Sequence, residues 1–211
     1  MKYLFWKEEK VEDNSIENIS RMYDSGFVFT RIDKGIMHQT RSLRINLDRF
    51  ELSSENRRIL KKGESISIKD SAIPYSSYNW RIGKIGKDFY ESHKADFSAN
   101  KIKELINSND SNFNLLLNYS DLAYAICYMN NNMLHYSYPF YNLENSSKDM
   151  GMIIMLKAIL WAKDKKIKYI YLGSLQRPTD IYKLQFSGME WFDGKKWSDD
   201  TEEAKRMLNT K

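Results

Sequence analysis

The sequence predicts an α+β protein with a mixed, mostly antiparallel sheet flanked by helices and a small basic lobe at the N-terminus. The order of the segments supports this prediction. A helical and basic first third is followed by two helices and then by apolar segments of strand length. A strand, a helix and another strand follow between residues 136 and 173, the pattern of a β-α-β crossover. We predict two domains, a basic lobe over residues 1–64 and a larger domain over 65–211.

The first third begins with a helix and two strands. Residues 15–24 carry apolar side chains at helical spacing, and residues 27–31 are β-branched and aromatic, as in a strand. Residues 41–47 alternate polar and apolar side chains, which predicts a half-buried strand. Its outward positions would present Arg41 or Arg44 to an anion.

A second helix follows at the end of the basic lobe. Ser53 or Ser54 would cap it, and Gly63 would end it after Lys62. Its basic residues fall largely on one side. They are Arg57, Arg58, Lys61 and Lys62.

The rest of the chain alternates between irregular, helical and apolar segments. Residues 70–84 are predicted to be irregular, and residues 85–95 and 98–106 are predicted to be helices. The later elements are strands over 113–118, 122–129 and 133–141, a helix over 150–163, a strand over 167–172 and a closing helix over 201–208.

Composition excludes several classes of protein. The chain of 211 residues is 42% hydrophobic and 29% charged, which is ordinary for a globular protein, and no apolar window is long enough for a membrane span. One cysteine, Cys127, excludes an internal disulfide framework, and three scattered histidines lack the spacing of metal ligands. We therefore predict a cytoplasmic protein without a metal or cofactor.

Positive charge is concentrated near the N-terminus. Residues 26–62 contain nine Lys and Arg against four Asp and Glu, a local excess equal to the whole net charge of +5. Such a lobe suits a phosphate-bearing partner, because the release of counterions gives strong, salt-sensitive binding. A solvated basic face is the alternative interpretation.

The crossover helix is a second place for an anionic ligand. It opens near Lys148 and Gly151, where its N-terminal N–H groups lack partners and carry a partial positive charge. The order of elements around it resembles the GNAT-type acyltransferase fold. In that fold the strands splay apart at the crossover and admit an activated acyl donor.

Ordered sequence blocks also resemble one enzyme family, the arginyl-tRNA–protein transferases, including the bacterial leucyltransferases that act on acidic N-termini. Residues 41–50 and 53–61 resemble its "R-x-x-R…F…S-x-x-x-R-R" block, and residues 89–102 occupy the place of its middle helices. Two further matches follow in order. They are YPFYNLE at 138–144 before Gly151 for "Y-D-P…S-L-G", and YLG at 171–173 with Tyr182, Lys183 and Phe186 for "Y-x-G…Y-K-x-x-F".

The resemblance implies transfer of an aminoacyl group, arginine or leucine, from aminoacyl-tRNA to the α-amine of an acidic protein N-terminus, as in the N-end rule of protein degradation. The family commonly carries an N-terminal cysteine cluster and a "C-P-K-M" loop. Here no cysteine precedes Cys127, and the loop at 174–181 reads SLQRPTDI. A cluster-binding or redox role is therefore not carried over.

The resemblance also implies roles for individual residues. Glu144 would hold or deprotonate the acceptor amine, and Tyr182 and Lys183 would grip the tRNA end or polarise the ester. Lys148 and the N–H groups near Gly151 would meet the terminal phosphate or ribose of the tRNA. The other expected substrate- or tRNA-binding residues are Arg41, Arg44, Arg57, Arg58, Tyr138, Tyr141, Asn142, Tyr171, Gly173 and Phe186.

Two other functions stay open from the sequence. A coenzyme A-dependent N-acyltransferase would usually carry a "Q/R-x-x-G-x-G/A" loop at the crossover helix, where only Gly151 stands here. A non-catalytic module that binds tRNA or protein on a transferase scaffold would bind tRNA whether or not it is charged. Several site residues also have ordinary structural explanations, such as aromatic packing for Tyr182 and helix capping near Lys148.

Overall fold

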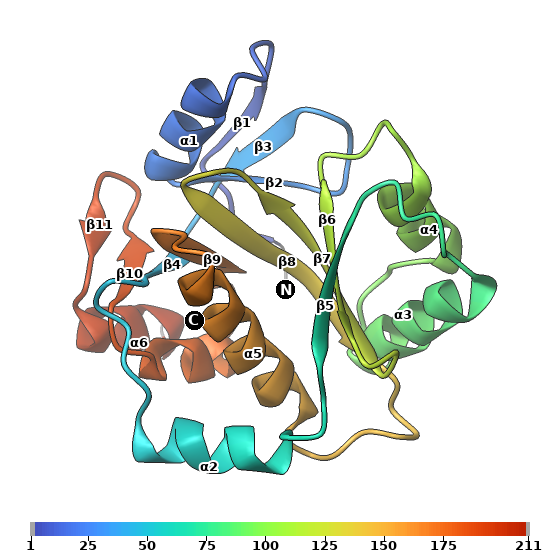
Figure 1. The fold of residues 1–211 in the computed structure, drawn as a ribbon. Helices are drawn as coiled ribbons and strands as arrows, with labels where there is room; N and C mark the ends of the chain where they lie inside the picture. Colours follow the sequence, from blue (N-terminus) through green and yellow to red (C-terminus); the bar gives the residue numbers. More distant parts are fainter. Residues whose placement is uncertain (1–2, 210–211) are drawn as a thin grey trace. The chain divides into compact units, whose positions relative to one another are not determined.

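The structure is a computed structural model that describes residues 3–209 (Figure 1). It divides into two compact units, each assembled from separate segments of the chain. The first contains the described residues of Met1–Glu51, Asn130–His135 and Ala162–Lys211, and the second contains Leu52–Met129 and Tyr136–Trp161. Neither unit ends at residue 64, so the division into a 1–64 lobe and a 65–211 domain stays a prediction.

Two sheets form the first unit. The smaller sheet has the order β1 (Lys7–Lys10), β3 (Ile36–Gln39) and β2 (Phe27–Phe29). In the larger sheet, β11 (Trp197–Ser198), β10 (Met189–Phe192), β4 (Ser42–Asn46) and β9 (Tyr169–Ser174) are antiparallel neighbours in that order. The start of β8 (Met133–Tyr141) then pairs with β9 in parallel, from Met133↔Tyr169 to His135↔Tyr171.

A capping side chain and a glycine define the two ends of the first helix of this unit. The Ser15 side chain caps α1 (Ile16–Asp24), and Gly26 follows in the left-handed region at φ 82°, a conformation that favours glycine. Figure 1 shows α1 beside the small sheet. A 3₁₀ helix, η1 (Pro178–Gln185), and the closing helix α6 (Thr201–Asn209) complete the unit.

The second unit is an antiparallel meander with helices. β5 (Ile68–Ala72) pairs with β6 (Leu115–Tyr119), β6 pairs with β7 (Ala123–Met129), and β8 from Tyr136 onward is the next strand. Its helices are α2 (Ser54–Lys62), α3 (Trp80–Ser92), α4 (Ala99–Asn107) and most of α5 (Met150–Asp164).

The predicted α+β class and crossover are therefore confirmed. Within the described residues, β4 pairs antiparallel with β9 and β10, and β6 with β5 and β7. β8 and β9, which are joined by the crossover helix α5, pair in parallel, as expected for the GNAT-type arrangement. Apolar runs explain the buried strands: every residue of β6 is buried, and so are the first five of β7.

Three local predictions were wrong. The strand at 41–47 is not half-buried: Ser42 to Ile45 are all buried, because both faces of β4 are covered. The segment 70–84 is not wholly irregular, since β5 runs to Ala72 and α3 starts at Trp80. Strands β1, β3, β10 and β11 were not predicted at all.

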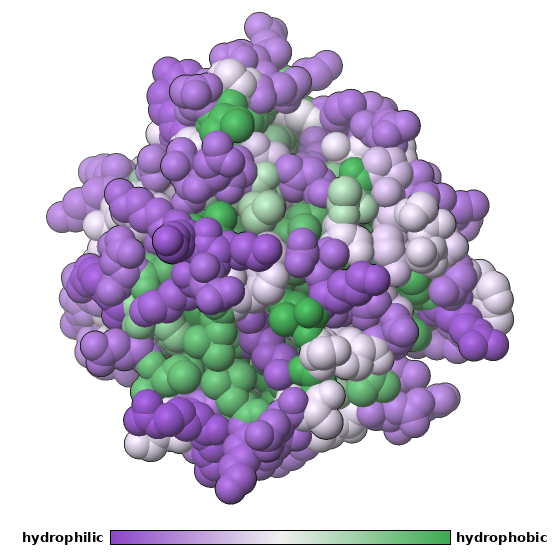
Figure 2. All heavy atoms as spheres, in the orientation of Figure 1, coloured by the Kyte–Doolittle hydropathy of each residue, from purple (hydrophilic) through white to green (hydrophobic). Residues whose placement is uncertain are grey.

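Hydrophilic residues cover most of the face shown in Figure 2, and hydrophobic residues gather in its lower left part and in smaller areas elsewhere. Among the described residues, no helix is long and apolar enough to cross a membrane.

Candidate functional site

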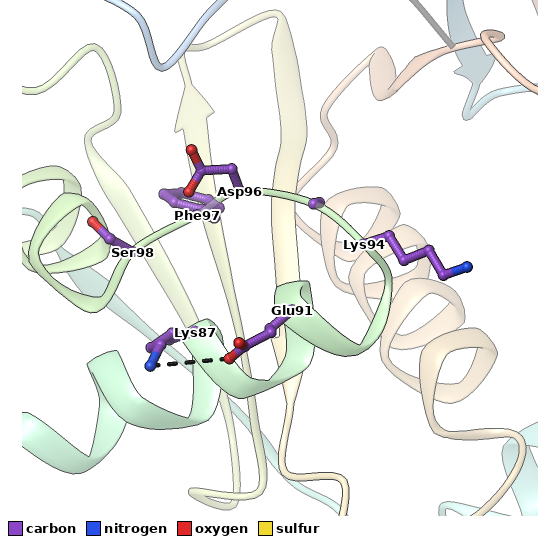
Figure 3. A pocket seen from close by; sticks show the side chains of 7 residues that line it. Lys87, Glu91, Lys94, Asp96, Phe97 and Ser98 are labelled. Atoms are coloured by element: carbon purple, nitrogen blue, oxygen red, sulfur yellow. Dashed lines mark ion pairs between the residues drawn. The ribbon is translucent and has the colours of Figure 1, made fainter.

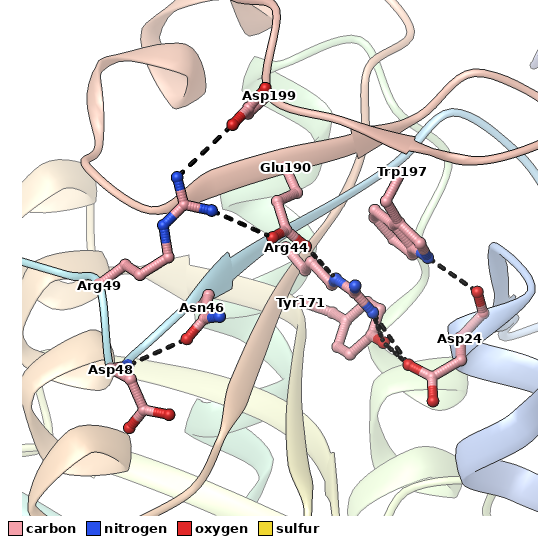
Figure 4. Close-up of polar contacts among 9 residues, drawn as sticks. All are labelled: Asp24, Arg44, Asn46, Asp48, Arg49, Tyr171, Glu190, Trp197 and Asp199. Atoms are coloured by element: carbon pink, nitrogen blue, oxygen red, sulfur yellow. Dashed lines mark hydrogen bonds and ion pairs between the residues drawn. The ribbon is translucent and has the colours of Figure 1, made fainter.

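Arg44 lies at the centre of a polar cluster in the first unit (Figure 4). Its side chain is only 9% exposed, and its guanidinium contacts the Asp24 carboxylate at 2.9 Å and the Glu190 carboxylate at 2.8 Å. It also donates to the Tyr171 hydroxyl at 3.2 Å. Arg44 was expected to face outward toward an anion. It is instead buried on β4, and protein groups already accept hydrogen bonds from its Nε and Nη1.

Two aromatic rings complete this cluster. The Arg44 guanidinium carbon lies 4.0 Å from the ring centroids of both Tyr169 and Trp197. Such cation–π contacts strengthen when the cation is desolvated. Burial alone would lower the pKa of Arg44, but the hydroxyl of Tyr171 and the carboxylate of Glu190 outweigh it and raise that pKa. Arg44 therefore stays charged and holds β4, β9 and β10 together.

Arg41 has a very different environment just before β4. Its side chain is partly buried, and its Nε has no exposed surface and no hydrogen-bond partner among the described residues. Burial lowers the pKa of this guanidinium, and no carboxylate offsets the effect. The backbone is anchored, because Leu175 N–H donates to the Arg41 carbonyl at 2.9 Å. Within residues 3–209 this arginine is a cation without a counter-ion.

The predicted pair Tyr182–Lys183 lies on η1. Lys183 is nearly buried and donates from Nζ to the Ser174 carbonyl at 3.2 Å, with Asp180 at 3.6 Å. Burial lowers the pKa of Lys183, and Asp180 partly offsets this. Asp180 also accepts from the N–H groups of Gln176 and Arg177 at 2.8 and 2.9 Å. Lys183 thus holds η1 to the end of β9, while the Tyr182 side chain is 41% exposed.

The other predicted residues of this unit surround the end of β9. Gly173 has φ 76°, and a Cβ added there would meet no atom within 4 Å. Phe186 is buried against Phe50, with ring centroids 6.4 Å apart. Gly173 therefore borders open space, whereas Phe186 is part of the core.

A cavity of about 480 Å³ lies wholly within the second unit. The turn after β8 supplies Asn142, Leu143 and Glu144 to it, and α3 supplies the rest of the lining. Those residues are Trp80, Arg81, Lys84, Ile85 and Asp88. The turn is held by its own hydrogen bonds: Asn142 Oδ1 accepts from Glu144 N–H at 2.9 Å, and Asn142 N–H donates to the Leu122 carbonyl at 2.9 Å.

The charges of this cavity are only partly paired. Lys84 and Asp88 form an ion pair, and the pKa of Lys84 is raised first by Asp88 and also by Glu144. No ion pair joins the side chains of Glu144 or Arg81 to any residue in the described part of the chain. Trp80 is 69% exposed and Leu143 is 42% exposed. The cavity thus offers a carboxylate, a guanidinium and apolar surface to a ligand.

The remaining aromatic and glycine residues that the sequence predicted for the site are packed against other side chains. The Tyr138 ring packs at 5.4 Å from both Phe97 and Phe113, and Tyr141 packs at 4.7 Å from Phe89. A Cβ on Gly151 would meet Tyr141 at an ordinary 3.6 Å.

The basic residues of α2 are exposed but partly engaged. Arg57 donates to the Leu52 carbonyl at 2.6 Å, and Arg58 forms two hydrogen bonds with Glu55 at 2.7 and 2.5 Å. Lys148 is exposed. The α2 helix keeps its positive charge at the surface, as predicted from its spacing.

A smaller cavity of about 340 Å³ lies between the end of α3 and the start of α4 (Figure 3). Its charged side chains are balanced, with Lys87 and Lys94 against Glu91 and Asp96. None of the predicted site residues lines it. Among the described residues, no group of His, Cys, Asp or Glu could hold a metal ion.

The predicted residues therefore fall into two sets, one in each unit. The first unit holds Arg41, Arg44, Tyr171, Gly173, Tyr182, Lys183 and Phe186, and the second holds Arg57, Arg58, Tyr138, Tyr141, Asn142, Glu144, Lys148 and Gly151. Sequence reasoning missed the α3 side of the larger cavity. The signal was present, because Arg81, Lys84 and Asp88 have the spacing of one helix face.

Comparison with known proteins gives a partial match. No protein-family model matches the chain. Over 80 residues, 37% of its length, the chain is 31% identical to an aspartate/glutamate leucyltransferase of Xanthomonas oryzae pv. oryzae. Over 64 residues it is 30% identical to the enzyme so named from Stenotrophomonas maltophilia. The match covers only part of these curated relatives, 32% and 26% of their lengths.

The similarity of this chain to solved structures is weaker than its sequence match. The structure of L-PGS from Bacillus licheniformis aligns with a TM-score of 0.48 at 12% identity, over 74% of this chain and 49% of that one. A GCN5-related glucosamine N-acetyltransferase region of a fungal multi-domain β-N-acetylglucosaminidase aligns with a TM-score of 0.47 at 10% identity, over 87% and 23%. The sequence match thus points to the aminoacyl transferases as the class of enzyme that this chain resembles.

Proposed function

We propose that the protein transfers an aminoacyl group, leucine or arginine, from aminoacyl-tRNA to the α-amine of an acidic residue at a protein N-terminus. One observation carries the proposal: the match of 31% identity over 80 residues to an aspartate/glutamate leucyltransferase. The name of that relative gives acidic residues as acceptors and leucine as the transferred residue. The basic surface of α2 adds support for a polyanionic donor.

The cavity beside Glu144 has the chemistry of an acceptor site. The Glu144 carboxylate would receive the α-ammonium group, and the Arg81 guanidinium would receive the side-chain carboxylate of the first residue. Trp80 and Leu143 would cover the aliphatic part of the peptide. A site with one anion and one cation left unpaired suits a ligand that carries both charges.

Transfer at this site requires little covalent help from the protein. The neutral amine attacks the ester carbonyl, a C–N bond forms, and the ester C–O bond breaks as the terminal ribose hydroxyl of the tRNA leaves. The proton lost from the amine passes to Glu144 or to solvent, and a proton goes to the leaving oxygen. An α-amine has a pKa of about 7.7–8.0, so a useful fraction is neutral near neutral pH. Alignment of amine and ester alone is worth up to roughly 7–11 kcal/mol.

The direct test supplies tRNA charged with radiolabelled leucine, arginine or other residues, and peptides that begin with Asp, Glu, Asn, Gln or Lys. We expect transfer to Asp and Glu peptides. Glu144→Gln should lower kcat/KM by roughly 10²-fold or more, as for loss of a group that handles the proton. Arg81→Gln should mainly raise KM for acidic peptides and reduce the preference for Asp over Asn.

The matched control is Glu91→Gln. It neutralises an exposed carboxylate that lies on α3 and outside this cavity. It should leave transfer unchanged. Absence of transfer from every charged tRNA, with folded protein and intact ester, would overturn the proposal. Tight binding of coenzyme A in calorimetry would favour an N-acyltransferase instead.

A further inference from the structure

Arg41 is a partly buried cation of the first unit. Its Nε is buried without an acceptor among the described residues, and no carboxylate pairs with its guanidinium there. Buried polar groups in native proteins almost always have partners, and an unpaired cationic donor is costly to keep. Such a group is explained when a ligand brings the missing anion.

Exposed aromatic rings lie on the segment that adjoins Arg41. Tyr3 is 44% exposed and Phe5 is 40% exposed, with ring centroids 6.2 Å apart in a stacked arrangement. Phe5 in turn stacks on His38 at 4.3 Å and an interplanar angle of 15°. The two rings therefore pack against each other and against His38 while part of each stays exposed to solvent.

Hydrogen bonds fix this aromatic segment against the residues next to Arg41. Thr40 Oγ1 donates to the Leu4 carbonyl at 2.7 Å, and the Gln176 amide bonds both the Leu4 N–H and the Leu4 carbonyl. Burial raises the pKa of the Tyr3 hydroxyl, and hydrogen bonding to the side chains of Ser174 and Thr40 partly offsets the rise. Thr40 directly precedes Arg41 in the chain.

We propose that Arg41 and the stacked rings of Tyr3 and Phe5 bind the single-stranded end of an RNA. The guanidinium takes a phosphodiester oxygen pair, and the rings stack against bases. The identification of this RNA with the aminoacyl-tRNA donor depends on the proposed function, whereas the binding itself does not. Base stacking on aromatic side chains and arginine contacts to phosphate are the usual means of holding single-stranded nucleic acid.

The chemistry here favours RNA over a peptide. A peptide N-terminus would need a free carboxylate for its ammonium group. Asp180, an acidic residue of η1, already accepts two backbone N–H groups and lies near Lys183. A base and a phosphate need only a ring face and a cation, and this surface supplies both.

The test measures binding of two RNA hairpins by fluorescence anisotropy. One ends in a four-nucleotide single-stranded 3′ overhang with 2-aminopurine in it, and the other is blunt. The wild type should prefer the overhang and quench the 2-aminopurine fluorescence on stacking. Arg41→Gln should weaken overhang binding about 5- to 10-fold and reduce the slope of log K against log salt by about 0.7, the value for one phosphate on a single strand.

Removal of the rings gives a second, separable effect. Phe5→Leu and Tyr3→Leu keep apolar side chains, so they should lose the quenching while the salt slope stays that of the wild type. The control Arg206→Gln removes an exposed cation from α6 and should change neither measurement. Circular dichroism and the unfolding midpoint confirm that each variant is folded.

Equal binding of the blunt and overhanging hairpins by the wild type, or wild-type binding by Arg41→Gln, would overturn this inference. These outcomes are independent of catalysis. If overhang binding depends on Arg41 but no aminoacyl group is transferred, the proposed function fails and this site stands. If transfer occurs and Arg41→Gln binds the overhang normally, the proposed function stands and this RNA site fails.

Discussion

Arg41 and Arg44 belong to the same stretch of chain. In the part of the chain that the structure describes, Arg44 pairs with two carboxylates and Arg41 pairs with none. Arg44 pairs with Tyr171 across the β4–β9 ladder, where carboxylates and aromatic rings enclose its guanidinium. Arg41 adjoins the other end of β9, where Gly173 borders open space. The register shifts between Ser42 and Arg44, so a bulge separates the two environments.

The difference shows how one block of basic residues can serve two purposes. A buried arginine is stable only when it is paired and hydrogen-bonded, as Arg44 is, and those bonds occupy donors that a ligand would need. An arginine without partners adds little to the stability of the fold, but its donors are available. The pairing state of each guanidinium, and not its place in a motif, separates a structural cation from a binding one.

The largest effect should follow removal of the Arg44 guanidinium. Arg44→Met leaves Glu190, whose side chain is only 15% exposed, without its close partner at 2.8 Å. Loss of one member of a buried ion pair costs about 3–5 kcal/mol. The free energy of unfolding from chemical denaturation should fall by that amount. Asp24 should matter little, because its side chain is 62% exposed.

The double variant Arg44→Met with Glu190→Gln tests the cause of that loss. It also removes the charge of Glu190, which in the single variant keeps Arg49 at 3.6 Å but has lost its closer partner, so it should recover part of the stability that the single variant loses. If the double variant is as unstable as the sum of both single variants, the pairing of Arg44 with Glu190 is not what stabilises this end of β9.

The second effect concerns acid sensitivity at the same end of the ladder. His135 pairs with Tyr171 in the sheet, and its Nδ1 lies 2.9 Å from the Tyr23 hydroxyl. Burial lowers the pKa of His135 to about 3, from 6.5 in the unfolded chain. Between these values the unfolded state binds one proton more than the folded state, so stability is full above pH 6.5 and falls as the pH decreases.

The expected slope is about 1.4 kcal/mol per pH unit from this one group, or roughly 2 kcal/mol between pH 6.5 and 5. Denaturant unfolding of the wild type and of His135→Gln at pH 7, 6 and 5 measures it. The variant should be less stable at pH 7 but less sensitive to acid over this range. The same pH dependence in both proteins would show that His135 is not buried in its neutral form.

Local sequence signals predicted the helices and most central strands. Serine caps before α1, α2 and α4 give each helix start a hydrogen-bond acceptor for a free N–H group, and this chemistry needs no tertiary contact. The apolar runs of β6, β7 and β8 were long enough to identify as strands. The crossover followed from their order with α5.

The features that the sequence did not reveal depend on contacts between residues that are far apart in the chain. Alternation in residues 41–47 suggested an outward Arg44, but Glu190 and Trp197 from the C-terminal part cover that face of the strand. The exposed charged strand β1 has no apolar pattern, and its pairing with β3 defines it. The spacing of the basic block could not tell Arg41 from Arg44, because only tertiary partners distinguish them.

A third and smaller effect tests the open end of β9. Gly173→Ala should cost about 1–2 kcal/mol, the strain of an L-residue in the left-handed region, since φ is 76° and no atom would clash with the new Cβ. Gly151→Ala is the matched control. It lies in α5, where its Cβ would make an ordinary contact at 3.6 Å, so it should be neutral or stabilise by up to about 1 kcal/mol. Thermal denaturation of both variants measures the difference in stability, which distinguishes backbone strain at Gly173 from a steric effect of the added methyl group.

The smallest effect on stability is expected at Arg41 itself. Arg41→Met keeps the aliphatic part of the side chain and removes a charge that no described residue pairs, so the free energy of unfolding should stay within about 0.5 kcal/mol of the wild type. The same substitution at Arg44 is expected to cost several times more, which makes the two variants a matched pair. A loss at Arg41 as large as that at Arg44 would mean that Arg41 has a structural partner after all, and its role as a cation kept for a ligand would have to be abandoned.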